Sequence, residues 1–268
     1  MLQYIYMKIC SLASGSKGNL IYIGYNNTNL LVDFGISTKE AEIRLASIGV
    51  RPESIDAILI THEHKDHIKG VELFAKKYGV DVYAYNGTWD LLDKTFKEIN
   101  LKKRIDFFLG DFFLGELTVV PFKVSHDASA CVGFSFIQGS NKISVATDLG
   151  FVCESAINNL KGSDIVLIES NHCAELLHMG KYPYFLKRRV SSREGHLSNE
   201  DAAVLNLELA KSGTKQIILA HLSAENNRPE LAYKTTANLL EAGGAVINKD
   251  VYIDIAFQDK KTALFEVV

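Results

Sequence analysis

The feature that most constrains this chain is a run of three histidines and one aspartate within six residues: His62, His64, Asp66 and His67. It directly follows the apolar segment 58–60. Histidine and aspartate are seldom buried in a protein core, and four of them together could be buried only with several hydrogen-bonding, charged or metal partners. They are also the nitrogen and oxygen donors that divalent metals bind in proteins. We therefore expect a metal site here rather than a solvated polar loop.

The spacing within the run predicts two metals rather than one. Side chains two residues apart in an extended segment point the same way, so His62 and His64 are expected to share one metal. A helical pattern follows from Ile68 onward, and the turn into it would direct Asp66 and His67 toward a second metal.

Three further candidates stand where other predicted strands end, at His126, Asp148 and His221. His126 would supply a third nitrogen to the first metal, Asp148 would bridge both metals, and His221 would complete the second. Each position alone is weak evidence for a metal ligand, because a polar residue at a strand end is more often a capping or loop residue. Together with the run at 62–67 they indicate a binuclear site.

Hydrophobic periodicity predicts a β-rich first half and an alternating β/α second half. Strands are expected at 8–12, 20–24, 29–33, 56–61, 80–84, 105–109, 117–124, 131–137, 142–146, 164–168, 215–220, 251–256 and 262–267. Helices are expected at 38–48, 68–78, 88–98, 153–160, 199–211 and 229–242. Two mixed sheets packed face to face, with helices outside, accommodate this order in one α+β domain spanning residues 1–268. The metal ligands would lie on loops at one edge of this αββα sandwich.

Composition excludes several classes of protein. The 268 residues are 47% hydrophobic and 23% charged, as in a globular protein with a substantial core. The formal net charge of −3 means that nucleic-acid contacts would need a local basic patch. The four cysteines form no C-x-x-C pair, which argues against a disulfide framework or a cysteine zinc finger. We identify neither a bilayer-spanning run nor a signal peptide, and expect a cytoplasmic protein with no membrane partner.

These motifs together resemble the metallo-β-lactamase superfamily, and in finer detail its YycJ/WalJ-type branch. The similar motifs lie at 12–19, 61–70, 169–172, 195–202 and 220–227. The resemblance implies the αββα fold, a two-metal site and a nuclease that degrades DNA from 5′ to 3′. Cys173 departs from the branch, which usually has Asp there, and Lys65 stands where a small residue is common.

The ligand set contains no cysteine, so manganese or iron is credible beside zinc as the divalent ion. The expected mechanism is hydrolysis by a hydroxide held between metals roughly 3.5–4 Å apart. Asp66 therefore counts as both a ligand and a catalytic residue.

A basic and aromatic segment at about 180–195 points to a phosphodiester substrate. Its candidate substrate-binding residues are Lys187, Arg188, Arg189 and Arg193, interleaved with Tyr182, Tyr184 and Phe185. The alternative is a solvated amphipathic helix.

Two histidines around this segment are further catalytic candidates. His196 could protonate the leaving group or bond a phosphoryl oxygen, or simply fix its loop. His172 is read as supporting the metals or facing substrate.

Ser198 and Asn199 open a helix whose N-terminus favours an anion, so both are expected at the substrate. The Gly- and Ser-rich loop 14–19 could likewise bind an anion through backbone N–H groups, or be an ordinary tight turn.

Three functions remain open at this point. The first is a metal-dependent nuclease, acting on DNA in preference to RNA. The second is a small-molecule hydrolase of the lactonase or glyoxalase type, whose activity would survive neutralisation of Arg188 and Arg189. The third is a metal-binding regulatory or scaffold protein without turnover. The oligomeric state cannot be predicted from the sequence.

Overall fold

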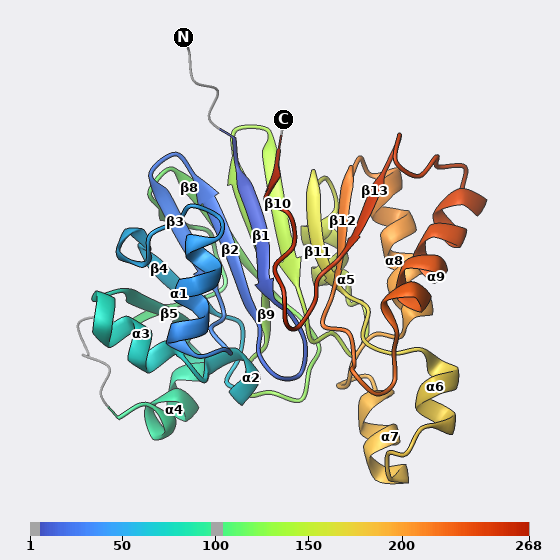
Figure 1. Cartoon of the computed structure of the whole chain (residues 1–268), viewed down its shortest axis with the longest axis horizontal. Coiled ribbons are helices and arrows are strands. Elements are labelled where there is room, and N and C mark those ends of the chain that lie inside the picture. The colour runs from blue at the N-terminus through green and yellow to red at the C-terminus, as the bar shows by residue number, and fades with distance from the viewer. Residues whose placement is uncertain (1–5, 98–103, 268) are drawn as a thin grey trace.

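Two seven-stranded sheets face each other in the computed structural model of the chain, which describes residues 6–97 and 104–267 (Figure 1). The first sheet contains, in spatial order, β14 (Phe265–Glu266), β1 (Lys8–Ala13), β2 (Leu20–Tyr25), β3 (Thr28–Val32), β4 (Ala57–Ile60), β5 (Asp81–Tyr85) and β6 (Arg104–Phe107). The second contains β13 (Tyr252–Ile255), β12 (Gln216–Ala220), β11 (Ile165–Glu169), β10 (Asn141–Ala146), β9 (Val132–Gln138), β8 (Leu117–Lys123) and β7 (Phe112–Leu114). Both sheets are mixed.

Helices cover the outer face of each sheet (Figure 1). On the first sheet lie α1 (Thr38–Ala46), the 3₁₀ turn η1 (Pro52–Ser54), α2 (Lys65–Ile68), α3 (Val71–Tyr78) and α4 (Asn86–Thr95). On the second lie α5 (Glu154–Leu160), α8 (Asn199–Lys211) and α9 (Pro229–Ala242). The short helices α6 (Ala174–Met179) and α7 (Tyr184–Val190) extend beyond the edge of the sheets (Figure 1). The predicted four-layer αββα sandwich is confirmed.

Three apolar layers hold the sandwich together. Residues from the inner faces of both sheets, such as Leu59 and Phe134, form the central layer. Phe74 and Trp89 belong to the layer between the first sheet and its helices, and Leu205 to the layer behind the second sheet. Since both faces of the central strands are covered, these strands read as continuous apolar runs rather than alternating, as in β4 and in β11 up to its last residue, Glu169.

The strands that precede the candidate ligands end at the same edge. β3 and β4 are parallel, and so are β10, β11 and β12. β8 is antiparallel to β9, which is antiparallel to β10, so β8 runs in the same direction as β10. Residues that follow these strands are therefore brought to one edge, where parallel sheets usually bind ligands.

The helix expected at 68–78 is wrong at its start. The chain already turns into α2 at Lys65, and α3 begins only at Val71. Gly70 separates the two helices, because its N–H donates to Phe34 O (2.8 Å) and a Cβ there would overlap Ile36 O. This close approach packs the residues behind Asp66 and His67 against the end of β3.

The short elements η1, β7 and α6 are absent from the sequence prediction, and α7 corresponds to the amphipathic helix given there as the alternative for the basic segment. Three residues of β7 are too few to show a period, and α6 has no capping side chain at Cys173. The helix expected at 88–98 spans 86–95 as α4, and residue 98 lies outside the described residues. Within the described ranges, no helix is both long and apolar enough to cross a membrane.

The close backbone approach at Gly35 leads to a testable prediction. Its N–H donates to Asn19 O (2.7 Å), and a Cβ there would overlap the backbone oxygen of Asp66. We expect Gly35→Ala to lower the free energy of unfolding by about 2 kcal/mol or more, as in other overpacked sites. Urea unfolding measures this.

The matched control is Gly87→Ala in α4, where a Cβ would make ordinary contact at 3.7 Å from Ala130 Cβ. There the smaller entropy of the unfolded chain should raise stability by about 0.4–1 kcal/mol. An equal effect of both substitutions would contradict the close approach at Gly35.

Candidate metal centre

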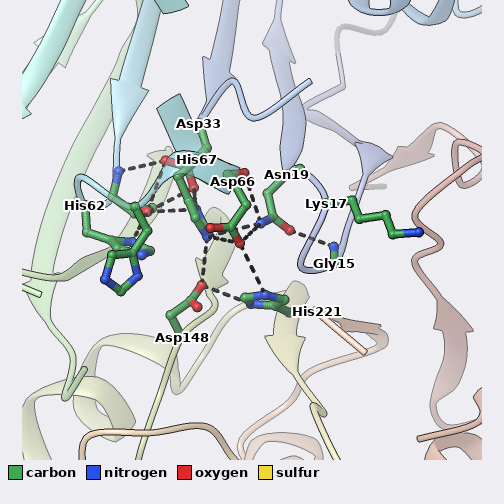
Figure 2. A network of polar contacts seen from close by, with 12 residues as sticks. Gly15, Lys17, Asn19, Asp33, His62, Asp66, His67, Asp148 and His221 are labelled. Carbon is green, nitrogen blue, oxygen red and sulfur yellow. Dashed lines mark hydrogen bonds and ion pairs between the residues drawn. The ribbon is translucent and has the colours of Figure 1, made fainter. Parts of the chain in front are cut away.

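The structure brings all seven predicted ligands to the edge where the strands end. His62 and His64 follow β4, and Asp66 and His67 stand in α2. The other three follow strands of the second sheet: His126 after β8, Asp148 after β10 and His221 after β12. Figure 2 shows His62, Asp66, His67, Asp148 and His221 converging. The site therefore joins the two sheets.

A first group of possible metal donors contains His62, His64 and His126. One ring nitrogen of each lies within 4.8 Å of the others. His126 Nε2 is 3.3 Å from His64 Nδ1, and His126 Nδ1 lies 3.0 Å from Gly195 O. Four ligands around a tetrahedral ion are about 3.3 Å apart when metal–ligand distances are about 2.0–2.1 Å. The sequence prediction grouped the same three residues.

A second group contains Asp66, His67 and His221, whose donor atoms also lie within 4.8 Å of one another. Asp66 Oδ2 is 3.4 Å from His67 Nε2 and 3.8 Å from His221 Nε2. These are the residues that the sequence analysis assigned to the second metal. Two other groups of donor atoms cross this division: His62, His67 and Asp148, and Asp148, Glu169, His196 and His221.

Asp148 lies between the groups. Its Oδ1 is 3.6 Å from His126 Nε2, and its Oδ2 is 3.3 Å from His67 Nε2 and 3.0 Å from His221 Nδ1. Only 2% of the residue is exposed. One carboxylate thus faces both groups with different oxygens, as a bridging ligand would.

The donor atoms have capacity for a cation. His62 Nε2, Asp148 Oδ2 and His221 Nδ1 are buried and have no hydrogen-bond partner among the described residues. The last two are close enough for an ion pair but lack hydrogen-bond geometry. Buried polar atoms are seldom left unpaired in folded proteins. The chemistry of the donor set and these free atoms fit two divalent ions.

The charges of the site differ between the two groups. Burial, then the charge of His67, holds the pKa of His62 well below its usual range. Burial opposes the charged form of His221 too, but Asp148 and Glu169 raise its pKa to about 9. Burial also disfavours the ionised form of Asp148, yet His221 and His67 hold its pKa well below its usual range. Because a ligating histidine must be neutral, occupancy of the second group requires His221 to release a proton.

Two residues that orient these ligands escaped the sequence prediction. Asp33 Oδ2 lies 2.7 Å from His67 Nδ1, and Asp33 Oδ1 accepts from the Thr61 N–H (2.9 Å). Asn19 Nδ2 lies 3.1 Å from His67 Nε2 and donates to Asp66 Oδ2 (3.4 Å) (Figure 2). A signal for Asp33 existed, since an acid directly after the apolar strand β3 needs a partner.

Three site residues adopt left-handed backbone conformations that are uncommon outside glycine. The φ angles are 58° at Asp33, 59° at Asp148 and 54° at His221. Each residue comes immediately or two residues after a strand. Such strain persists only where the surrounding structure enforces it, and it concentrates at functional sites.

Glu169 is a further functional candidate that the sequence analysis passed over. Its buried carboxylate lies 2.7 Å from His196 Nδ1 and 3.5 Å from His221 Nδ1. Its other oxygen accepts from the Leu149 and Leu197 N–H groups (2.7 and 3.2 Å). Burial disfavours a charged His196, but Glu169 raises its pKa above the usual value. Glu169 therefore orients His196 and leaves its Nε2 as the available ring atom.

The loop at 14–19 is a tight turn. The N–H groups of Gly15, Lys17 and Gly18 donate to Asn19 Oδ1, Gln258 Oε1 and Gly15 O respectively. Ser14 Oγ accepts from the His221 N–H (2.8 Å). These three backbone donors are used within the chain, and the loop fixes the ends of both ligand-bearing segments.

A cavity of about 210 Å³ opens over the metal-binding groups. It is lined by Ser16, His64, Asp66, His126, Asp148, Asn171, Tyr182, Leu186, Arg189, Val190, His196, His221, Ser223 and Asn226. Of the predicted substrate residues, Arg189 reaches this wall, where its Nε bonds Asp127 Oδ2 (2.5 Å). Lys187 and Arg188 lie on another face of α7, and Arg193 stacks on the Phe151 ring at 3.8 Å.

His172, Ser198 and Asn199 do not line this cavity. His172 lines a neighbouring one instead. Ser198 caps α8 by accepting from the Asp201 N–H (3.0 Å), and the buried Asn199 side chain bonds Ser170 and Asn227. Roles for these three at the reacting groups stay predictions.

Comparison with known proteins finds a family model that matches most of the chain and relatives of similar sequence. The model of the metallo-beta-lactamase superfamily matches residues 14–221. The chain is 40% identical over 234 residues to exodeoxyribonuclease YycJ of Bacillus anthracis, covering 87% of this chain and 89% of the relative. It is 39% identical over 263 residues to exodeoxyribonuclease WalJ of Streptococcus pneumoniae, covering 97% and 98%.

Solved structures agree on the fold. The metallo-beta-lactamase fold protein YhfI from Bacillus subtilis superposes with a TM-score of 0.73 at 18% identity, covering 98% of this chain and all of the other. At this identity the likeness concerns the architecture alone.

The two groups predict the number of metals per chain. We expect wild-type protein to bind about two divalent ions, and His126→Ala and His221→Ala to bind about one each, since each variant loses a ligand of one group. Elemental analysis after dialysis counts them. The exposed His178 provides the control, because His178→Ala should keep both ions. Full metal content in both ligand variants would contradict the assignment.

The role of Asp33 can be tested separately. Asp33→Asn should weaken metal affinity about 10–100-fold, because a carboxylate no longer orients His67. Asp56→Asn is a matched control, since Asp56 Oδ2 also accepts a backbone N–H, that of Asn29 (2.8 Å), away from the ligands. Competition with a chromogenic chelator gives both affinities, and equal affinities for the two variants would exclude the role.

Proposed function

The chain belongs to the metallo-beta-lactamase superfamily, and from that premise we propose that it is a metal-dependent exonuclease acting on DNA. The observation that carries the proposal is the buried Asp148 carboxylate between two groups of ligand atoms, at the floor of an open cavity. Two cations held there are a common arrangement for in-line displacement at phosphate.

The relatives support this substrate class. Two proteins named exodeoxyribonucleases are 39–40% identical over most of the chain. The small-molecule hydrolase and the protein without turnover are not favoured. DNA rather than RNA as substrate, attack from the 5′ end and a cytoplasmic location are parts of the proposal that extend beyond this similarity.

His62, His64 and His126 would hold one ion, Asp66, His67 and His221 the other, and Asp148 both. When bound, the ions would polarise the phosphodiester and lower the pKa of a shared water molecule. The all-His/Asp donor set suits zinc, with manganese or iron as alternatives.

His196 is our candidate for handling the proton on the leaving oxygen. Its Nδ1 faces Glu169 at 2.7 Å, and its ring lies at the cavity wall beside the Asp148 carboxylate, 3.7 Å from Nδ1. Glu169 stabilises the charged imidazolium, so Nε2 can carry the proton that the departing oxygen needs. We propose His196 as the general acid and Glu169 as its positioning residue.

Arg189 and Tyr182 give the cavity wall a cation and an aromatic ring on the side of α7. Arg189 is half exposed and anchored to Asp127, which follows His126 in the chain. A phosphate of the substrate strand could share this guanidinium, which has five donors. The position suits alignment of the strand over the ions.

The nuclease proposal is tested by degradation of end-labelled DNA duplexes with manganese, beside RNA of the same sequence. Wild type should degrade DNA from one end, and Asp66→Ala should be inactive because it loses a metal ligand. Labels at the 5′ or 3′ end report the polarity. DNA left intact by metal-loaded wild type would refute the proposal.

The role of His196 requires a different substrate pair. His196→Ala should lower kcat on DNA by about 10²–10⁴-fold, as expected for a lost general acid. On a p-nitrophenyl phosphodiester, whose leaving group needs no proton, the loss should be less than about tenfold. Lys211→Ala, at an exposed residue of α8 outside both cavities, should match wild type on both. Equal losses on both substrates would mean that His196 acts elsewhere in the reaction.

A further inference from the structure

A second cavity, of about 390 Å³, lies on the other side of α7 from the metal centre. It is lined by His172, Ala174, Leu177, His178, Tyr184, Lys187, Arg188 and Ser191. Its volume falls within the roughly 300–1,000 Å³ typical of small-ligand pockets. The proposed reaction assigns it no role.

The two cavities share α7 as a wall. Leu186, Arg189 and Val190 line the metal cavity, whereas Lys187 and Arg188 line the second. A helix with its side chains is about 10–12 Å across. That distance equals about three steps of a duplex strand at 3.4 Å per nucleotide, and fewer steps of a stretched strand. A strand whose phosphodiester lies over the metals can therefore reach the second cavity.

His172 is the buried polar residue in this cavity wall. The residue is only 3% exposed, and its Nδ1 is buried without a hydrogen-bond partner in the described part of the chain. Burial lowers the pKa of His172 to about 4, so the ring is neutral and offers one donor and one acceptor. Its backbone is fixed by the Asn199 N–H, which donates to His172 O (2.8 Å). Because the buried Nδ1 does not open onto the cavity, a ligand with a polar edge would bond Nε2, the other ring nitrogen.

The remaining walls suit a flat aromatic ligand attached to a polyanion. Leu177 is buried and apolar, while 76% of Tyr184 is exposed. The Arg188 guanidinium lies 5.9 Å from the centre of the Tyr184 ring. Lys187 lies on the same face of α7, with Nζ bonded to His178 O (2.6 Å). Aromatic rings flanked by basic side chains bind single-stranded nucleic acid by stacking on bases and pairing with phosphates.

We propose that this cavity binds a nucleobase of the substrate strand, one to three nucleotides from the scissile phosphate. The inference rests on the proposed function and adds a base-binding subsite to it. Tyr184 and Leu177 contact the faces of the base, His172 bonds its edge, and Arg188 and Lys187 neutralise the adjoining phosphates. The site gives the otherwise unexplained residues of the basic segment and His172 a common ligand.

The test uses single-stranded DNA oligonucleotides that each carry one abasic residue, moved stepwise along the first five positions from the end that is degraded. KM and kcat are measured with manganese, and dissociation constants in EDTA, so that the result does not depend on turnover. For wild type, the abasic residue at one position between the second and fourth should raise KM and the dissociation constant about tenfold, with kcat unchanged.

Two variants identify the cavity. Ala174 is an exposed residue of its wall, so Ala174→Trp fills it without disturbing the core. This variant should bind the intact strand about tenfold more weakly, and its affinity should no longer depend on the abasic position. The control is Ala224→Trp, which fills a third cavity of about 380 Å³ beside the metal centre and should keep the wild-type dependence.

Each outcome decides the matter. Equal effects of all abasic positions in wild type, or a position dependence that survives in Ala174→Trp, would overturn the subsite. Loss of the dependence in Ala224→Trp alone would place the base in the third cavity and also overturn it. A positional effect on binding without any cleavage would support the subsite and refute only the exonuclease proposal, so the two failures are distinguishable.

Discussion

A single buried carboxylate organises this structure. Asp148 lies within 3.0–3.7 Å of four histidines, one from the first sheet and three from segments of the second. A charged group so deeply buried is tolerated only with close opposite charges or a metal. The packing of the sheets and the charge balance of the site therefore depend on each other, because the carboxylate would lose its histidine partners if one sheet shifted relative to the other.

The supports around that carboxylate come from segments far apart in the chain. Asn19 and Asp33 hold the ligands of α2, and Glu169 holds His196. Gly35 and Gly70 allow backbones to meet where a side chain would not fit. Rigid strand ends thus supply the positions, while α6 and α7 project beyond the sheets and α7 lines the cavity over the metal-binding groups (Figure 1).

Much of this could be predicted from the sequence, for physical reasons that differ by feature. The sandwich follows from apolar periodicity. The ligand groups follow from the dense His/Asp run, because the spacing between neighbouring residues decides which side chains point the same way. The roles of Asp33 and Glu169 were missed. An acid that directly follows an apolar strand signals that Asp33 needs a partner, but which residue pairs with either carboxylate is known only after folding brings together residues 27–34 positions apart. The break at Gly70 depends on a contact with Phe34, which periodicity does not encode.

The left-handed residues Asp33, Asp148 and His221 have a consequence for laboratory evolution. Each such conformation costs about 1–3 kcal/mol in a residue other than glycine. Glycine adopts the same backbone without strain, but at these positions it would also remove one member of a buried pair, which costs about 3–5 kcal/mol. The strained side chains therefore stabilise the fold as well as supplying the donor atoms of the site. Heat-resistant variants of this protein should arise from substitutions elsewhere in the chain, and these three positions should stay unchanged even when catalysis is not selected.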